Sequence, residues 1–586
     1  MKQQDKRQGT LWKSVAGAAS GRWRAAGCLF LALALGVIPP LLIFVRAHLI
    51  DGALSVRSDM AAFLLALALF CALCLVRAVG QALLEHALLV RSSRRGAALD
   101  RARAQKSADV LYAETEKPSF RPLLERAKRA PEADAERFRA LCTMVRLAAE
   151  LVLSAAALAV YDVWAALGIA VLLLFGMVLN RALSARTAGF WIRYIERMRR
   201  TDYLSALLLY REYAAERRLF GFEKEIGRRF CAEFASARRS NARAGRRRLA
   251  GEALLQLLFA VYAGAAALLL LRPLLAGAIT LGAFTSAFYA AVGLQTACRD
   301  ASAAVFSASE GRKKLDSFDE FLRLPEEEGT LGEAPSAEIC FRGVTFAYPG
   351  QPEPVLKGVS FRLAEGRHYA LVGENGCGKT TLVKLLLGLY RPQSGEVTVG
   401  GVPVEQLSPA GRRRLFSVVF QDLYRYPLTL RENASLSAGH PLSDEEMQAA
   451  FARLDLSPSA AEGALGYDVP LLPFKREGAG LSGGEWQKLA VVRSILSPAP
   501  VAVLDEPNAS LDPLVERAVN GALRDLLKGR TALFISHRLG TVHTADEILV
   551  LRQGKLIAMA PHEALMDSCG YYAELYRTQR GLYENG

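Results

Sequence analysis

Long apolar runs fill the first half of the chain, and short ones fill the second. The long runs are about twenty residues each, the length at which a helix crosses the hydrocarbon core of a bilayer. Only Tyr161-Asp162 separates the third run from the fourth, and only Arg272-Pro273 separates the fifth from the sixth. We therefore expect a tight turn at both places. The pattern predicts six membrane-spanning helices, at residues 25–47, 60–83, 141–160, 162–183, 250–271 and 275–297.

The basic residues gather in the two long connections, 84–140 and 184–249. These hold 13 and 17 lysines and arginines, whereas the three short connections hold one, none and one. By the positive-inside rule, both long connections and both termini lie in the cytoplasm. This orientation accounts for most of the formal net charge of +15, so we expect the lipid bilayer and not nucleic acid as a partner.

Both long connections are rich in helix-forming residues, and Pro118 interrupts the first with a turn signal. They predict membrane helices that continue into the cytoplasm, with short crossing segments near 114–120 and 212–222. Residues 1–24 are basic and contain tryptophan, which favours a helix in the membrane interface. A cleaved signal peptide is the alternative, disfavoured because the first span is long and more spans follow. We expect no leader peptidase ahead of that span.

The nine cysteines are scattered, and no disulfide framework or zinc spacing emerges from them. We expect reduced thiols.

The character of the chain changes after residue 321. Residues 322–336 are acidic, contain proline and glycine, and lack an apolar stripe, which indicates a linker. From 337 to 586, short β-type runs alternate with helical ones, as in an α/β nucleotide-binding domain. The expected fold is thus an α-helical membrane domain at 25–321 with long cytoplasmic extensions, followed by an α/β P-loop domain.

A phosphate-binding loop stands between a strand pattern at 369–372 and a helix pattern at 381–387. It fits G-x-x-x-x-G-K-[ST], in which small residues let backbone N–H groups close around phosphate oxygens at a helix N-terminus. We expect the Lys379 ammonium on the β- and γ-phosphates and the Thr380 hydroxyl on Mg²⁺. The candidate ATP-binding residues here are Gly373, Glu374, Asn375, Gly376, Cys377, Gly378, Lys379, Thr380 and Thr381.

Two further segments complete this chemistry. Asp505 and Glu506 end an apolar strand pattern, where the first suits an outer-shell role on Mg²⁺ and the second can act on the attacking water. Ser482-Gly483-Gly484 opens a helix, and a hydroxyl with bare amides at a helix N-terminus suits a second phosphate site. One nucleotide does not need two such sites from one fold. We therefore expect two copies of the domain to clasp ATP between them.

This ordered set of motifs resembles that of ABC half-transporters of the exporter type, with the type IV fold. The resemblance implies that Tyr348 stacks on adenine, that Gln421 touches Mg²⁺ together with Thr380 and Asp505, and that Ser482, Gly483 and Gly484 contact the partner's ATP. It implies catalytic roles for Lys379, Glu506 and His537, a D-loop role for Asp512, and coupling roles for the segments near 114–120 and 212–222.

The sequence departs from the family pattern at three places. Glu485 stands where glutamine is usual, Asn508 where threonine is common, and 473–478 matches the cross-domain loop only loosely. A carboxylate near a phosphate site weakens that site unless it is turned away or paired. The partner is therefore expected to be a second half-transporter, either an identical chain or a different one.

The expected function is ATP-driven export across a bacterial cell membrane by alternating access. A lipid, a peptide or a hydrophobic small molecule all remain open as substrate. An importer with the same fold, an ATP-gated regulatory membrane protein and a soluble ATPase acting on DNA or ribosomes are the alternatives. Polar residues in the spans, which tend to face a cavity or a partner, are Arg77, Glu85, Glu150, Glu252 and Gln256. The aromatic residues Phe284, Phe288 and Tyr289 could line an apolar pocket, but we favour lipid-facing or helix-packing roles for them.

Overall fold

The computed structural model separates into two compact units. The first comprises Met1–Ala108 and Pro122–Arg323, and the second comprises Asp109–Arg121 and Leu324–Gly586. The structure describes residues 21–54, 60–161, 163–164, 166–167, 171, 198, 200–327, 329–452, 466–468, 470–471, 481–506, 527–535, 542 and 545–584.

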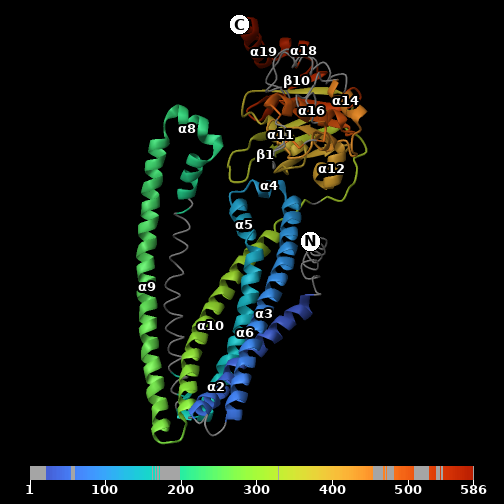
Figure 1. Cartoon of the computed structure of the whole chain (residues 1–586). Helices are drawn as coiled ribbons and strands as arrows, with labels where there is room; N and C mark the ends of the chain where they lie inside the picture. Colours follow the sequence, from blue (N-terminus) through green and yellow to red (C-terminus); the bar gives the residue numbers. More distant parts are fainter. Residues whose placement is uncertain are drawn as a thin grey trace. The chain divides into compact units, whose positions relative to one another are not determined.

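The first unit is built from long helices (Figure 1). α10 packs against α6, α2 and α9, and α2 packs against α6. Pro39 and Pro40 stay inside α2, which continues through them. The helices and their bounds are α2 (Gly21–Leu54), α3 (Met60–Asp109), α5 (Phe120–Ala127), α6 (Ala130–Tyr161), η2 (Arg211–Tyr213), α8 (Ala214–Phe220), α9 (Glu223–Leu275) and α10 (Leu281–Leu322).

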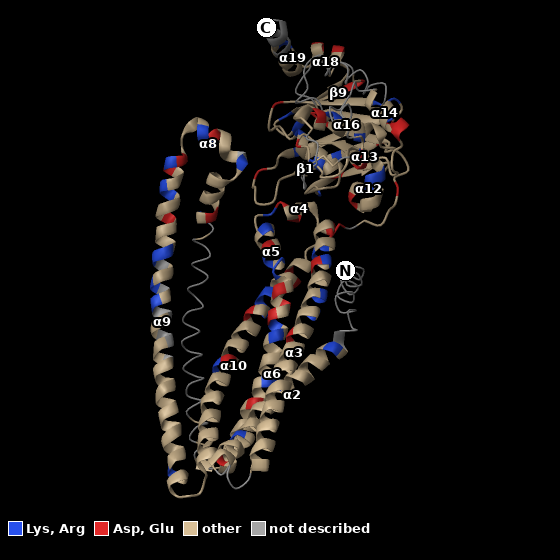
Figure 2. Ribbon diagram, in the orientation of Figure 1, with Lys and Arg blue, Asp and Glu red and all other residues tan. Residues whose placement is uncertain are grey.

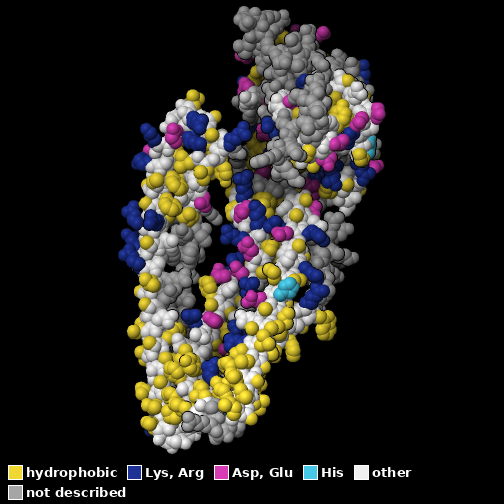
Figure 3. All heavy atoms as spheres, in the orientation of Figure 1, with side chains coloured by type: hydrophobic (Ala, Val, Ile, Leu, Met, Phe, Trp, Pro, Cys, Tyr) yellow, Lys and Arg dark blue, Asp and Glu magenta, His cyan; other side chains and the backbone are white. Residues whose placement is uncertain are grey.

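Charged and apolar residues separate along these helices. Figure 2 shows lysine and arginine along one half of each of α3, α6 and α9, and few toward their other ends. Figure 3 shows hydrophobic side chains gathered over those other ends. Among the described residues, four helices are long and apolar enough to cross a membrane, namely Trp23–Leu54, Met60–Asp109, Ala130–Tyr161 and Gln256–Leu275. This distribution is that of a multi-pass membrane unit.

One predicted turn is wrong. The fifth span was expected to end at Arg272-Pro273, but α9 continues through both residues to Leu275. Pro273 has no N–H to donate to the carbonyl four residues before it, so it removes one hydrogen bond from the last turn of α9 and does not by itself end the helix. The turn comes four residues later, at Gly277, whose φ of 69° permits the left-handed conformation that ends helices.

The other membrane predictions fare differently. The long first connection is helical, as expected. The turn predicted at Tyr161-Asp162 falls at residue 162, which lies outside the described residues. The sixth span was expected from residue 275, but Leu275 is the last residue of α9 and α10 begins at Leu281; α10 is not among the four helices named above. Most of the fourth span, and residues 1–20 of the expected interfacial segment, lie outside the described residues.

The second unit contains two sheets. The smaller is antiparallel, in the order β2-β1-β4-β5. The larger has the order β10-β9-β3-β8-β7-β6, with parallel pairing from β9 to β6 and antiparallel β10 at one edge. Strands β3 and β7 are buried almost throughout, as expected for a parallel sheet covered by helices on both faces.

The bounds of these strands are β1 (Ile339–Phe346), β2 (Leu356–Leu363), β3 (His368–Val372), β4 (Ser394–Val399), β5 (Val402–Pro403), β6 (Phe416–Val419), β7 (Val501–Asp505), β8 (Thr531–Ile535), β9 (Glu547–Arg552) and β10 (Lys555–Ala560). The helices are α11 (Lys379–Leu386), η3 (Val404–Gln406), α12 (Pro409–Leu415), α13 (Leu430–Ser435), α14 (Asp444–Ala452), α16 (Gly483–Leu496), α18 (His562–Ser568) and α19 (Gly570–Glu584).

The second unit also takes in a piece of the first long connection. Residues Asp109–Arg121, which include the short helix α4 (Tyr112–Thr115), group with it by their contacts. The Leu111 amide donates to the Pro325 carbonyl at 3.0 Å, and the Glu327 amide donates to the Asp109 carbonyl at 3.2 Å. This segment, called the coupling segment below, is therefore tied to the α/β unit by backbone hydrogen bonds.

Candidate functional site

The phosphate-binding loop lies between β3 and α11, as the sequence predicts. Gly376 and Gly378 have φ values of 78° and 110°, a region that residues with a Cβ rarely adopt. The Lys379 side chain folds over the loop, and its ammonium donates to the carbonyls of Gly373 at 2.8 Å and Glu374 at 3.0 Å. The cation thus lies over the concave face of the loop, where phosphate oxygens would be held.

The turn between β9 and β10 supports this loop from behind. The Gly554 amide donates to the Cys377 carbonyl at 3.2 Å. A Cβ on Gly373 would lie 2.3 Å from the Leu551 carbonyl oxygen, so only glycine permits this close approach. The loop is thereby fixed to the sheet as well as to its own helix.

Asp505 ends β7 beside the loop and is only 2% exposed. Burial and the adjacent Glu506 carboxylate raise the pKa of Asp505 to about 6, although Lys379 and a hydrogen bond with Thr380 oppose the rise. Burial likewise lowers the pKa of Lys379. A buried carboxylate beside a threonine hydroxyl, both at a phosphate loop, is the oxygen donor set that Mg²⁺ prefers. The residues present therefore fit Mg²⁺ together with a nucleoside triphosphate.

Glu506 has a strained backbone. Its φ is 49°, which costs a residue other than glycine about 1–3 kcal/mol and persists only where the surroundings enforce it. Its amide donates to the Ile535 carbonyl at 3.0 Å. Its carboxylate accepts a hydrogen bond from the Gln421 amide at 3.1 Å. The structure thus brings together the predicted catalytic acid and the glutamine predicted to bind Mg²⁺.

The segment Ser482–Gly484 begins α16, as expected, and the structure explains Glu485. The Ser482 hydroxyl accepts from the Glu485 amide at 3.3 Å, while the Ser482 amide donates to the Glu485 carboxylate at 2.7 Å. This reciprocal pair is a capping box, which satisfies two donors of the helix N-terminus. The Ser482 side chain is used here only as an acceptor, so its own O–H remains able to donate to an anion.

Tyr348 lies within a cluster of tyrosines around α11. Its hydroxyl is 3.0 Å from the Thr381 hydroxyl, and its ring packs edge-on against Tyr390 with the centroids 5.4 Å apart. The Lys384 ammonium lies 5.4–5.7 Å from the ring centroids of Tyr348, Tyr390 and Tyr112, within the range of cation–π attraction. The candidate adenine-binding ring is thus packed against the helix that follows the phosphate loop.

The coupling segment enters this cluster through Glu116. Its carboxylate accepts from Lys384 at 2.9 Å, from Tyr112 at 2.7 Å, and from Tyr390. Partial burial raises the pKa of Glu116, but these three hydrogen bonds outweigh it and lower the pKa overall. Sequence reasoning placed the crossing segment correctly but missed Glu116, Lys384 and Tyr390, because no local motif links residues that are nearly 270 positions apart.

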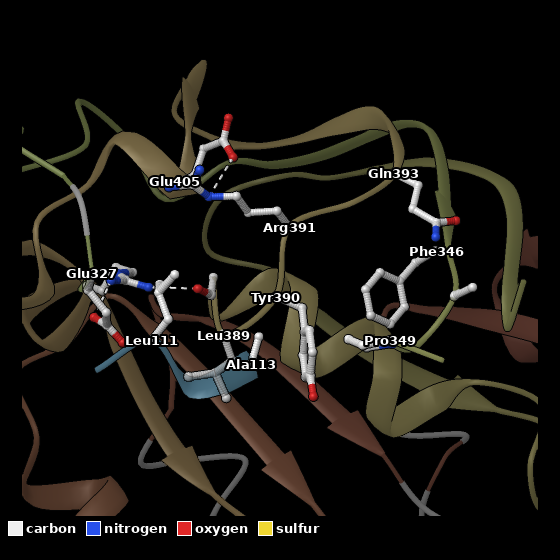
Figure 4. A pocket seen from close by; sticks show the side chains of 13 residues that line it. Leu111, Ala113, Glu327, Phe346, Pro349, Leu389, Tyr390, Arg391, Gln393 and Glu405 are labelled. Carbon is white, nitrogen blue, oxygen red and sulfur yellow. Dashed lines mark hydrogen bonds and ion pairs between the residues drawn. The ribbon is translucent and has the colours of Figure 1, made fainter. Parts of the chain in front are cut away.

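A cavity of about 340 Å³ lies beside the same cluster (Figure 4). Leu111 and Ala113 of the coupling segment line it together with Phe346 and Tyr390. Its charged side chains are paired, Arg391 with Glu405 at 3.4 Å and Arg412 with Glu327. The described lining residues include none of the phosphate loop. The cavity therefore lies where the coupling segment packs against the α/β unit, and it is not the nucleotide site.

Several predicted site residues lie outside the described residues. These are Asn508, Asp512, His537 and the segment 473–478. The described part of the chain holds no cluster of three or more metal-ligating side chains, and the described cysteines form no disulfide.

The polar residues predicted in the membrane spans differ in their surroundings. Glu150 of α6 lies within electrostatic range of Arg77 of α3, Arg146 of α6 and Asp300 of α10. Glu85 and Gln256 are exposed, and the side chain of Glu252 is outside the described set. Phe284 and Phe288 pack against the buried cluster around Tyr262. Tyr289 is 61% exposed, with the Arg46 guanidinium 5.2 Å from its ring centroid.

Known proteins resemble this chain in sequence and in fold. Residues 356–509 match the family model described as ABC transporter. An ATP-dependent lipid A-core flippase of Bordetella pertussis is 33% identical over 393 residues, 64% of this chain and 59% of the flippase. The subtilin transport ATP-binding protein SpaT of Bacillus subtilis is 31% identical over 307 residues, 51% of this chain and 50% of that protein. The chain thus spans between half and three fifths of the length of these curated relatives.

A bacterial Atm1-family ABC exporter with ATP bound has the same fold. The superposition has a TM-score of 0.79 and covers 97% of this chain and 99% of that one, at 19% identity. The chain therefore has the fold of an ABC exporter, with a helical membrane unit and an α/β P-loop unit, as the sequence predicts.

Proposed function

We propose that this chain is one half of an ATP-driven exporter. The observation that carries the proposal is the arrangement of Lys379, Asp505, Glu506 and Gln421 around one phosphate loop, in a chain whose first unit is built from membrane-spanning helices. An ATPase site joined to a membrane unit of exporter fold favours transport over a soluble role. The site faces the cytoplasm of a bacterial cell, because the basic extensions of the helices do.

Each residue of the site has a proposed role. The loop amides and Lys379 hold the β- and γ-phosphates, and Tyr348 stacks on adenine. Thr380, Asp505 and Gln421 would hold Mg²⁺, which neutralises developing charge on the phosphate oxygens. Glu506 orients the attacking water or removes its proton, which is why its carboxylate must be aimed by Gln421. Outside the described residues, His537 and Asp512 complete the proposed site at the γ-phosphate and the D-loop.

Coupling between the two activities runs through the short crossing segments. Closure of two ATPase domains on ATP would move the coupling segment with α11, since Glu116 bonds Lys384, and the membrane helices would change from inward-open to outward-open. ATP drives this change only by binding the closed arrangement better than the open one. Hydrolysis then separates the domains and resets the cycle.

The partner is proposed to be a second copy of this chain. Glu485 has its carboxylate bound to the Ser482 amide, so its charge is directed at its own helix and is compatible with a working site. The second crossing segment also supports a dimer of half-transporters. Leu219 and Phe220 on α8 are 79% and 70% exposed, and exposed apolar side chains at a helix tip suit a contact with the ATPase domain of another half-transporter.

The substrate is proposed to be an amphiphile with a charged head group, of the lipid class. Charged side chains within membrane spans mark substrate pathways, and Arg77, Arg146, Glu150 and Asp300 gather from three helices. A relative is named a lipid A-core flippase, which favours lipid over a free small molecule. We expect lipids with an anionic head group to stimulate ATP hydrolysis. Replacing Arg77 and Arg146 with glutamine should abolish that stimulation, whereas Glu85→Gln, which lies outside this charged group, should keep it.

The first experiment is the ATPase rate of this chain alone in lipid nanodiscs, with Glu506→Gln as the blank. Turnover well above the blank supports a homodimer with two working sites. A folded sample that binds ATP but does not exceed the blank would require a different half-transporter as partner. Turnover by Glu506→Gln equal to that of the wild type would contradict the catalytic role of Glu506 itself.

A further inference from the structure

The backbone of Glu506 is held from two sides, by the Ile535 carbonyl and by the Gln487 side chain. We infer that Gln487 is a positioning residue, which fixes Glu506 in its left-handed conformation and thereby lets α16 set the aim of the catalytic carboxylate in the same chain. The inference rests on the proposed role of Glu506 in hydrolysis.

Gln487 lies on α16, five positions after Ser482, and is only 4% exposed. Its side-chain amide donates to the Glu506 carbonyl at 3.2 Å. On the other side, the Glu506 amide donates to the carbonyl of Ile535 at the end of β8 at 3.0 Å. Both backbone polar groups of a strained residue are therefore bonded, one to the sheet and one to a helix.

This arrangement matters because φ is 49° at Glu506. A left-handed residue with a side chain relaxes toward a negative φ unless neighbouring groups prevent it. Rotation of that backbone would swing the side chain, and the carboxylate would leave its 3.1 Å hydrogen bond with Gln421. The hydrogen bond from Gln487 thus helps to orient the Glu506 carboxylate, although Gln487 itself does not contact the reacting atoms.

A second side-chain hydrogen bond between α16 and the sheet serves as the control for the Gln487 bond. The Ser417 hydroxyl of β6 donates to the Ser494 hydroxyl at 2.9 Å, and Ser494 is 1% exposed. This pair lies at the other end of α16 and does not contact Glu506. Ser494→Ala removes the hydroxyl partner of Ser417, which can still donate to the Ser494 carbonyl at 3.3 Å; we expect this change to lower stability slightly and to leave hydrolysis unaffected.

The consequence concerns the two sites of the dimer. In the proposed dimer, Ser482–Gly484 contacts the partner's ATP, and Gln487 lies in the second turn of the helix that this segment begins. A shift of α16 when the partner's ATP binds would be transmitted by Gln487 to the Glu506 backbone. In each chain, the segment Ser482–Gly484, which contacts the partner's ATP, is then connected to Glu506, which acts on the ATP held by the chain's own phosphate loop.

The test replaces Gln487 with methionine, which keeps the volume and removes the donor, in the full chain in nanodiscs. We expect kcat for ATP to fall by 10-fold or more, with KM and the Kd for ATP within about 2-fold of the wild type. Amide exchange at Glu506 should be faster than in the wild type, because the strained backbone can relax. Ser494→Ala should instead lower Tm and keep kcat within about 2-fold.

The outcomes separate the inference from the proposed function. If Glu506→Gln is inactive while Gln487→Met keeps wild-type kcat, the inference is overturned and the proposed function stands. A parallel loss of kcat and Tm in both Gln487→Met and Ser494→Ala would also overturn it, since Gln487 would then have only a structural role. Turnover by Glu506→Gln would instead contradict the proposed function.

Discussion

The Glu116 carboxylate accepts a hydrogen bond from the Lys384 ammonium at 2.9 Å, although 268 positions separate the two residues. Glu116 lies in the coupling segment of the first long connection, and Lys384 lies on the helix that begins at the phosphate-binding lysine. The bond therefore joins a segment that continues from the membrane helices to the helix that carries the ATP site. Because the pair is partly buried and shared with two tyrosine hydroxyls, it is worth more than an exposed surface ion pair.

Breaking this pair should uncouple transport from hydrolysis. In Glu116→Ala, the Lys384 ammonium and two tyrosine hydroxyls lose their shared acceptor, so the coupling segment is held less firmly. We expect the amount of substrate moved per ATP hydrolysed to fall about 5-fold or more in proteoliposomes. Glu114→Ala is the matched control, because Glu114 pairs locally with Lys117 and should retain the wild-type ratio. An unchanged ratio in Glu116→Ala would refute a coupling role.

Replacing Asp505 with asparagine should stabilise the nucleotide-free protein while abolishing Mg²⁺-dependent hydrolysis. The pKa of Asp505 is raised to about 6, so the folded chain binds more protons than the unfolded chain between about pH 4 and pH 6. Stability contributed by this group is therefore lost as the pH rises through that range. At neutral pH the cost is up to roughly 3 kcal/mol, since one pKa unit corresponds to about 1.4 kcal/mol.

The measurement is Tm in nanodiscs as a function of pH. Asp505→Asn should have the higher Tm at pH 7.5, and its advantage should shrink as the pH approaches 5.5. A Tm below that of the wild type at pH 7.5 would mean that the ionised carboxylate stabilises the fold.

Glu485→Gln should be nearly neutral, whereas Glu485→Ala should not. Glutamine can still accept from the Ser482 amide and complete the capping box, but alanine leaves that donor unpaired, at a cost of about 0.5–2 kcal/mol. We expect a lower Tm and a weaker ATPase for the alanine variant only. Glu432→Ala is the control, because Glu432 closes the same kind of box with Thr429 at α13 and should lower Tm alone. A large gain of turnover in Glu485→Gln would show instead that the charge weakens the site.

The junction of α2 and α10 should be sensitive to Asp51. Its carboxylate accepts from the Thr280 hydroxyl at 2.6 Å and from the Gly282 amide at 2.8 Å. Asp51→Ala removes this acceptor from the N-terminus of α10 and should destabilise the membrane unit by about 1–2 kcal/mol. Gly282→Ala should be at least as harmful, because its Cβ would lie 2.3 Å from the Ala47 carbonyl oxygen. Wild-type thermal stability of both variants in nanodiscs would contradict this.

Part of the candidate site was readable before the fold was known. The phosphate loop is a local structure, since Gly376, Gly378 and Lys379 act within a few residues of each other and their order specifies strand, turn and helix. Asp505 was readable for the same reason, as a polar residue ending a strand pattern. The turn expected at Arg272-Pro273 was misplaced because α9 continues through Pro273 to Leu275 despite the lost hydrogen bond, and the turn comes only at the left-handed Gly277.

The sequence by itself determined the helical membrane class of the first unit, the α/β class of the second unit and the strand, loop and helix around the phosphate-loop motif. These follow from periodicity, charge and short motifs, which depend on neighbours in the chain. Only the tertiary structure decided that Gln421 and Gln487 converge on Glu506, that Glu485 closes a capping box, and that Glu116 bonds Lys384. Such hydrogen bonds depend on where folded elements meet and on which rotamers their packing allows, and no spacing along the chain specifies either.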